Sequence, residues 1–326
     1  MGKLELKEHS NLWKSAYDKE SVLLKKVFEG ELLFIHHIGS TSIKGMLAKP
    51  IVDILIEVQD INKTILYEKA MENSGYVCKG ENGIKGRRYY VKNKNNVRSY
   101  HVHVYQIGSI EATKHLAFRD YLIENEDAAK RYQNLKENIF KSSSGNLKLY
   151  QDLKSPLVQE LTNNAIQWAN KNKKISVIGY ILRNRDSFDN ELLTLRFNSL
   201  PNIALRIPGG GVEINEDLID ALNREIKEET GLDNLIFKRK LGTYSYYKPF
   251  SKKIVERHDY LLFSSQHTSA NWNHIITGDG GDSKSCVELK WIKHKDFMKV
   301  DPEHRKFLTR KHIPELFDND FNINKT

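Results

Sequence analysis

The sequence predicts a two-domain α/β (α+β) protein, and three observations lead to this prediction. Its 326 residues are many for one hydrophobic core and suit two domains. Short apolar strands and amphipathic helices follow one another in both halves of the chain. Between the halves, the charged run at 170–174 has no apolar periodicity, as expected of a linker. We therefore expect a first domain at 1–168, a linker at 169–174 and a second domain at 175–326.

The composition is that of a soluble globular protein, with 39% hydrophobic and 29% charged residues. No apolar run has the length needed to span a bilayer, and the first residues lack the apolar core of a signal peptide. We expect a cytoplasmic protein that does not enter a membrane. Its two cysteines, Cys78 and Cys286, exclude a disulfide framework and make a zinc cluster implausible.

The formal net charge of +9 favours anionic partners, because a positive field concentrates phosphates around the protein. A nucleotide or a nucleotide-linked small molecule satisfies this preference. Nucleic acid is the less favoured partner, because the sequence contains no RNA-binding signature, no Cys/His finger and no long Lys/Arg block. A homodimer is compatible with the sequence, which does not specify the oligomeric state.

The first domain opens with an amphipathic helix at about 11–29, followed by strands at 32–38 and 51–58. The first strand ends in Gly39-Ser40, and the second carries Asp53. Nucleotidyltransferase folds bind a nucleotide through this arrangement: backbone N–H groups and the serine hydroxyl receive phosphate, while the aspartate holds a metal ion.

A later strand at 100–105 alternates strictly, so His101 and His103 face the same side of it. Two imidazoles and a carboxylate form a recognisable ligand set, and these histidines could complete a metal or substrate site with Asp53 and His37. The alternative is an ordinary polar sheet surface. One or two helices are expected to follow at 115–140.

Four motifs stand out between residues 10 and 165. They are His37–Ser42, Lys49–Asp53, His101–His103 and Leu116–Leu122. On these motifs the first domain resembles the GrpB family of nucleotidyltransferase-like domains, which implies a mixed sheet with helices. Active nucleotidyltransferases carry a second carboxylate two residues after the first, and Leu55 occupies that position here. The resemblance thus predicts a fold, and leaves both catalysis and mere nucleotide binding open.

The second domain begins with expected strands at 175–183 and 191–197, and the segment 204–208 then leads to the glycines 209–211. A helix at about 218–230 would place Glu225, Glu228 and Glu229 at positions i, i+3 and i+4, on one face. Three carboxylates on one face repel each other unless a cation lies among them. Hard oxygen ligands select Mg²⁺ or Mn²⁺, which bind phosphate oxygens as well.

The spacing from Gly210 to Glu216, then to 224–225, 228–229 and 231–232, matches every fixed position of one signature. The second half therefore resembles the Nudix hydrolases, whose fold is an α/β/α sandwich. The resemblance implies that Glu225, Glu229 and the Gly209 carbonyl bind the metal directly. Glu228 would bind it through water or act as the base. The remaining implied roles concern Arg224, which would orient the carboxylates, and Glu216, which would brace the loop.

One departure from the family pattern is Asn215, which occupies a position where glycine is frequent. A positive φ there would cost some strain, although Asn tolerates this conformation better than most residues. Other candidates for the site are Tyr244–Tyr247, Asp279, Asp282 and Glu288. For the tyrosines packing is the favoured reading, and for the two aspartates a plain turn.

The function expected from these features is Mg²⁺- or Mn²⁺-dependent hydrolysis of a nucleoside diphosphate linked to another moiety. One alternative makes the first domain an active nucleotidyltransferase with a small acceptor. A second makes it a non-catalytic module that captures a nucleotide or a protein. A third is pyrophosphohydrolysis at the 5′ end of RNA, which the basic charge favours.

Overall fold

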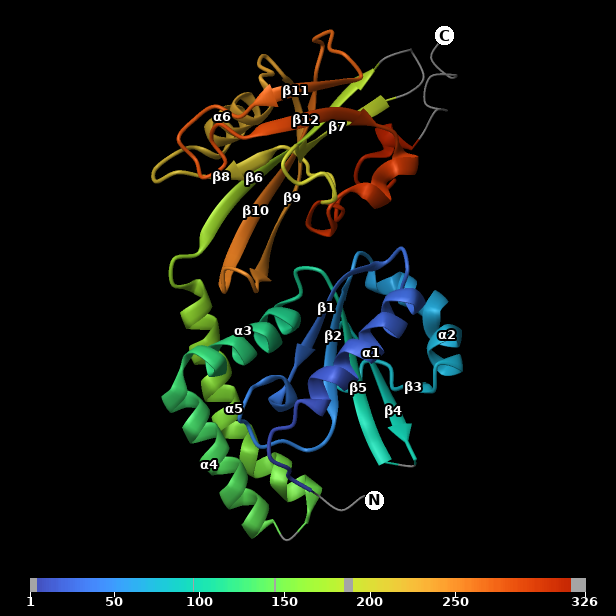
Figure 1. The fold of residues 1–326 in the computed structure, drawn as a ribbon, viewed down its shortest axis with the longest axis vertical. Helices are drawn as coiled ribbons and strands as arrows, with labels where there is room; N and C mark the ends of the chain where they lie inside the picture. Colours follow the sequence, from blue (N-terminus) through green and yellow to red (C-terminus); the bar gives the residue numbers. More distant parts are fainter. Residues whose placement is uncertain (1–4, 96, 144, 185–189, 318–326) are drawn as a thin grey trace. The chain divides into compact units, whose positions relative to one another are not determined.

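The computed structural model describes residues 5–95, 97–143, 145–184 and 190–317. Residue contacts divide the chain into two compact units. The first comprises Met1–Lys173 and Tyr246–Ile254, and the second comprises Lys174–Ser245 and Val255–Thr326. Each unit contains a mixed sheet with helices, which confirms the predicted α/β fold class (Figure 1). Among the described residues, no helix is both long and apolar enough to cross a bilayer.

The sheet of the first unit has five strands in the order β1-β2-β5-β4-β3. Their bounds are Leu32–Ile38 for β1, Val52–Val58 for β2, Tyr76–Cys78 for β3, Arg87–Lys94 for β4 and Val97–Gln106 for β5. The central pair, β2 and β5, is parallel, and the register places Asp53 beside His101. Because side chains in register point to the same face, the carboxylate and the imidazole are neighbours.

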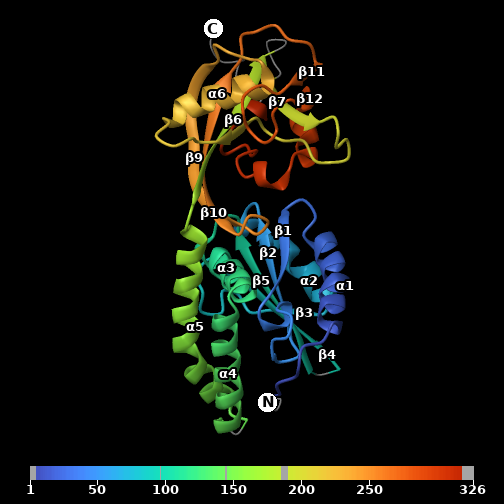
Figure 2. The same cartoon turned by 60° about the vertical axis from the view of Figure 1, so that its left-hand side comes forward.

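Helices cover both faces of this sheet. The helices are α1 (Leu12–Val27), α2 (Glu68–Asn73), α3 (Ile110–Glu124), α4 (Glu126–Ser142) and α5 (Leu147–Asn170). Two helices, α1 and α2, pack on one face, against the alternate apolar residues Ile54 and Ile56 of β2. On the other face Leu55 packs with apolar residues of α3 and α5. Figures 1 and 2 show α4 and α5 side by side.

The sheet of the second unit runs β11-β12-β7-β6-β10-β9, and the short strand β8 pairs with β6. The bounds are Lys174–Asn184 for β6, Asn190–Phe197 for β7, Gly209–Gly211 for β8, Ile236–Lys248 for β9, Lys253–Phe263 for β10, Asn271–Ile275 for β11 and Cys286–Ile292 for β12. Strands β6 and β10 are parallel. Three 3₁₀ helices follow β12, at His294–Lys299, Pro302–His304 and Pro314–Leu316.

The one α-helix described in the second unit is α6, Leu218–Thr230, with the predicted bounds. The Asp217 side chain caps it by accepting a hydrogen bond from the Ile219 N–H, and Gly231 ends it at φ 73°. Its apolar face, which includes Ile226, is buried in the core of the sheet. A Cβ added at Gly179 of β6 would lie 2.7 Å from Cδ1 of Ile226, so the missing side chain lets α6 approach β6 closely.

Candidate active site

The glycine strand β8 forms one wall of the site in the second unit. Gly209 has φ 142°, and a Cβ there would lie 2.2 Å from the carbonyl oxygen of Val177. A Cβ on Gly210 would lie 2.3 Å from Oε2 of Glu225. Glycine is therefore needed at both positions, at Gly209 by the backbone conformation and at Gly210 by the approach of a carboxylate.

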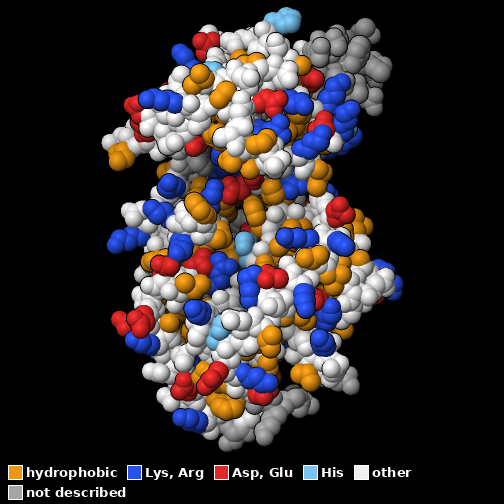
Figure 3. All heavy atoms as spheres, viewed as in Figure 1, with side chains coloured by type: hydrophobic (Ala, Val, Ile, Leu, Met, Phe, Trp, Pro, Cys, Tyr) orange, Lys and Arg blue, Asp and Glu red, His pale blue; other side chains and the backbone are white. Residues whose placement is uncertain are grey.

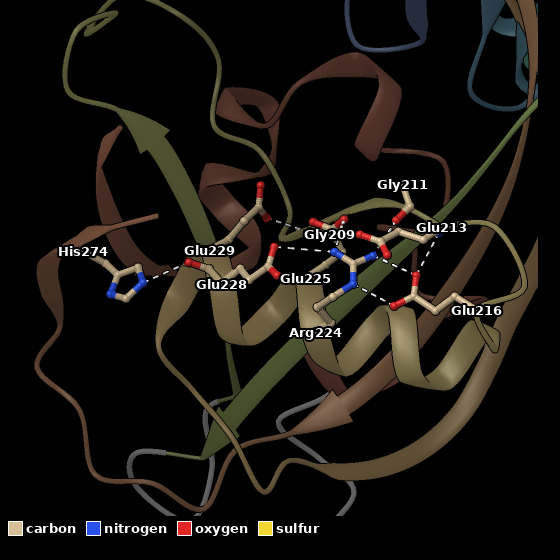
Figure 4. Close-up of polar contacts among 9 residues, drawn as sticks. All are labelled: Gly209, Gly211, Glu213, Glu216, Arg224, Glu225, Glu228, Glu229 and His274. Atoms are coloured by element: carbon tan, nitrogen blue, oxygen red, sulfur yellow. Dashed lines mark hydrogen bonds and ion pairs between the residues drawn. The ribbon is translucent and has the colours of Figure 1, made fainter. Parts of the chain in front are cut away.

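Arg224 of α6 ties the loop after β8 to the helix carboxylates (Figure 4). Its Nε donates to Oε1 of Glu216 at 2.7 Å, and its Nη1 donates to Oε1 of Glu225 at 2.9 Å. The same Nη1 lies 3.5 Å from Glu228. These hydrogen bonds from Arg224 lower the pKa of Glu216 to about 2. Glu216 also accepts a hydrogen bond from the Glu213 N–H at 2.8 Å, so it links the loop after β8 to α6.

Glu229 is buried, with 8% of its surface exposed. It accepts a hydrogen bond from the Gly209 N–H at 2.8 Å, which Figure 4 shows. Among the described residues, no Lys, Arg or His side chain forms an ion pair with it. Burial raises the pKa of Glu229 to about 7, and the Gly209 hydrogen bond only partly opposes this shift. Burial also raises the pKa of Glu225, against the opposing effect of Arg224. Among the described residues, the charged form of Glu229 therefore has no cationic side chain in contact with it, and Arg206 stabilises it only from a distance.

The carboxylates supply only hard oxygen donors, which suit Mg²⁺ or Mn²⁺. Glu229 in particular is a buried carboxylate that a cation would neutralise. In this conformation, however, no three His, Cys, Asp or Glu side chains in the described parts of either unit form a group that could hold a metal ion. The contacts explain why: Arg224 engages Glu225, and the Gly209 amide engages Glu229. The predicted ligands are neighbours, and these side chains must turn toward one another to share a cation.

A loop after β11 closes the site on the side of Glu228. The Nε2 of His274 lies 3.0 Å from the carbonyl oxygen of Glu228, and a Cβ at Gly278 would lie 2.5 Å from the Glu228 carboxyl carbon. Asp279 and Asp282 are exposed in this loop. The sequence pointed to this loop, from Gly278 to Asp282, as a candidate part of the site, but it gave no signal for His274, which comes close to α6 only through tertiary packing.

The other candidates in the second unit have structural partners. Glu288 on β12 forms an ion pair with Arg196 at 2.7 Å. The tyrosines Tyr244, Tyr246 and Tyr247 are all buried, as the favoured packing interpretation requires. Asn215 has φ 64°, so the strain expected at this position is present.

The predicted residues of the first unit also lie together. A Cβ on Gly39, which has φ 71°, would lie 2.5 Å from Oδ2 of Asp53. Oδ1 of Asp53 lies 3.0 Å from Nδ1 of His101 and 3.9 Å from Nε2 of His103. Burial alone would raise the pKa of Asp53, but its contacts with the two histidines outweigh burial and hold the pKa well below its usual range.

The prediction that His37 joins this cluster is wrong. Its ring stacks on Tyr17 of α1 at 4.9 Å, and its Nε2 lies 3.0 Å from the Thr41 hydroxyl. Because side chains alternate along β1, His37 points to the α1 face and away from Asp53. The same alternation places His36 on the face of Asp53, where it contacts Glu57 at 3.3 Å.

A cavity of about 210 Å³ lies beside Asp53. Its lining includes the predicted residues Ser40, Asp53 and His101. It also includes three lysines that sequence reasoning missed, Lys49, Lys136 and Lys154. Lys49 lies within the motif Lys49–Asp53, so the sequence contained a local indication that this lysine belongs to the site. Lys136 and Lys154 come from α4 and α5, and only the packing of these helices brings them together.

Comparisons with known proteins match the two halves of the chain to different families. The model of the family described as GrpB protein matches residues 3–164, and that of the NUDIX domain matches residues 173–311. The UPF0157 protein YqkA of Bacillus subtilis is 38% identical over 187 residues, which are 57% of this chain and 54% of that protein. The chain thus spans about half the length of YqkA.

Two further relatives match one half each. The glutamate-rich protein GrpB of Alkalihalophilus pseudofirmus is 31% identical over 166 residues, which are 50% of this chain and 95% of that protein. The m7GpppN-mRNA hydrolase NUDT17 of Danio rerio is 37% identical over 112 residues, which are 31% of this chain and 36% of that protein.

Proposed function

The chain belongs to the GrpB family through its first half and carries a NUDIX domain of the Nudix hydrolases in its second; from this premise we propose that the second domain cleaves a diphosphate bond linking a nucleoside to another moiety, with Mg²⁺ or Mn²⁺. The observation that carries the proposal is the placement of the α6 glutamates against the glycine strand. Glu225 fills the space left by Gly210, and Glu229 reaches the amide of Gly209.

Each residue of the site receives one role. Glu225, Glu229 and the Gly209 carbonyl would hold the cation, and Glu228 would bind it through water or take a proton from the attacking water. When bound, the divalent cation supplies neutralisation of the diphosphate oxygens, a more acidic water and stabilisation of the leaving phosphate. Arg224 acts as a positioning residue, because its guanidinium contacts Glu216 and Glu225 at once.

The first test is a panel of nucleoside diphosphate derivatives and dinucleoside polyphosphates, incubated with the full chain and Mg²⁺ or Mn²⁺ in ¹⁸O-labelled water. We expect mass spectrometry to find two phosphorylated products, one of which carries the label. Glu225→Gln and Glu229→Gln should each lose orders of magnitude in rate. Asp220→Asn removes an exposed carboxylate from the same helix and should keep the wild-type rate. Full metal-dependent turnover by Glu229→Gln would rule out the proposed ligand set.

Hydrolysis at the 5′ end of RNA is the second candidate, supported by the net charge of +9 and by the relative named as an m7GpppN-mRNA hydrolase. On the face shown in Figure 3, Lys and Arg are interspersed with Asp and Glu, which favours a small substrate. Capped and triphosphorylated RNA belong in the same panel. If RNA is the substrate, its turnover should fall steeply as salt is raised.

The first domain is proposed to serve as a binding module. Leu55 is fully buried in the apolar core, where an active nucleotidyltransferase carries its second metal-binding carboxylate. An active transferase would instead move a labelled nucleotide onto a small acceptor, and Asp53→Ala would abolish this transfer. Absence of transfer from all four nucleoside triphosphates, together with measurable ligand binding, would support the binding module.

A further inference from the structure

Three lysine side chains converge on the cavity of the first unit, from three different segments. Lys49 precedes β2, Lys136 belongs to α4 and Lys154 belongs to α5. Lys136 is 2% exposed, and its Nζ donates to the Ser40 hydroxyl at 3.1 Å and to the Leu47 carbonyl. Lys49 Nζ lies 4.7 Å from the centre of the Tyr150 ring. These contacts hold the ammonium groups at the cavity wall.

In the described part of the chain, no carboxylate forms an ion pair with Lys49, Lys136 or Lys154. Burial lowers the pKa of Lys136 to about 7, and repulsion from Lys154 adds to the shift. Burial and the charge of Lys154 likewise lower the pKa of Lys49 to about 8. Gathering three like charges is unfavourable unless an anion binds among them.

The lining of the cavity also includes a carboxylate. Asp53 presents a carboxylate that is 27% exposed, held by the 3.0 Å contact with His101. The lining therefore offers hydrogen-bond donors and positive charge from the lysines, together with a negatively charged acceptor from Asp53. Its volume of about 210 Å³ is below the common range for drug-sized ligands, about 300–1,000 Å³, and suits a small molecule.

We propose that the first domain binds a small phosphorylated molecule with free hydroxyl groups in this cavity. Its phosphoryl group would lie against Lys49, Lys136, Lys154 and the Ser40 hydroxyl. One of its hydroxyl groups would donate to Asp53. A bare phosphate satisfies only the first half of this arrangement, and the carboxylate repels it. The proposal is independent of the hydrolytic site on α6, which lies in the other unit.

Isothermal titration calorimetry on the full chain tests this site. The buffer contains EDTA, so that divalent metal cannot contribute, and the probes are inorganic phosphate and ribose 5-phosphate. We expect one site per chain, with ribose 5-phosphate bound more tightly than phosphate. Lys154→Ala and Lys49→Ala should each lower the affinity for both probes by about tenfold or more. Lys148→Ala is the matched control, because it removes an exposed charge from the same helix, α5, outside the cavity lining. It should change both affinities by less than about twofold.

Asp53→Asn separates the two halves of the site. This variant should have a lower affinity for ribose 5-phosphate, because the acceptor for its hydroxyl group has lost its charge. Its affinity for inorganic phosphate should equal or exceed that of the wild type, because the repulsive charge is gone. Unchanged melting temperatures identify variants that keep the fold. A functional site for a small ligand should bind with a Kd of about 10 mM or tighter. Absence of binding by either probe at that concentration would therefore overturn the proposal. Equal losses in Lys154→Ala and Lys148→Ala would overturn it as well, because they indicate a diffuse charge effect.

Discussion

Glu229→Gln should make the metal-free protein more stable at pH 8 while it abolishes hydrolysis. Folding raises the pKa of Glu229 from 4.5 to about 7. Below pH 4.5 the group is protonated in both states and the shift has no effect. As the pH rises from 4.5 to 7 the unfolded chain releases the proton first, so stability falls; above pH 7 the loss is complete. At about 1.4 kcal/mol per pH unit, this loss is about 3 kcal/mol.

Glutamine has no charge to bury, and its amide oxygen can accept the Gly209 N–H in place of Oε2 of Glu229. The variant should therefore gain up to about 3 kcal/mol over the wild type at pH 8, and almost nothing at pH 4.5. Hydrogen exchange of the buried β6 amides, measured in EDTA, reports the stability of the second unit. Asp220→Asn, an exposed carboxylate of α6, should change it by less than about 0.5 kcal/mol. If Glu229→Gln lost stability equally at both pH values, Glu229 would be ionised and well paired in the native state, and the reasoning would be wrong.

Arg224→Lys should lower the hydrolytic rate by about 10–100-fold, because a single ammonium group cannot donate to Glu216 and Glu225 with the geometry of a guanidinium. A rate within twofold of the wild type would contradict the positioning role. Gly209→Ala should cost roughly 3 kcal/mol or more, since its Cβ meets backbone, and urea unfolding measures this loss. Gly210→Ala meets only the flexible Glu225 carboxylate, so it should lower the rate by about 100-fold with a smaller loss of stability. Because Asn215 has φ 64°, Asn215→Ala should lower the free energy of unfolding by about 1 kcal/mol, and Asn215→Gly should hardly change it. Equal melting temperatures of the two variants would show that the backbone is not strained at this position.

The features that could be predicted from the sequence are those set by the spacing of residues that are close together along the chain. Helix α6 was predicted with its observed bounds, because the spacing of its carboxylates and the glycine at position 231 are local signals. Neighbouring strands likewise allowed Asp53, His101 and His103 to be grouped before the fold was known. The assignment of His37 failed because the alternation along β1 had to be counted relative to the sheet face, which the sequence alone does not mark.

The features that depend on tertiary packing were missed. Helix α5 was not predicted, and it contains Pro156, which ordinarily interrupts a helix. Packing of Leu161 and Ala165 in the interior stabilises the helix despite the proline. The lysine cavity was missed because it depends on tertiary packing as well. Lys136 of α4 and Lys154 of α5 line the same cavity only because these two helices pack against each other. His274 belongs to β11 and comes near Glu228 only because this strand packs beside the end of α6, which no local pattern specifies.

The absence of a side chain at Gly179 sets the depth at which the catalytic helix rests on its sheet, since Ile226 occupies the vacated space. A methyl group at position 179 would lift α6 and carry the glutamates away from the glycine strand, although Ile226 itself is buried in the core. Shortening the isoleucine to valine would remove the atom that lies 2.7 Å from that methyl group, so that only contacts of 3.1 Å and more, led by Cδ1 of Leu262, have to relax. The two positions should therefore tolerate change only as a pair, so that substitutions harmful one at a time restore activity when combined.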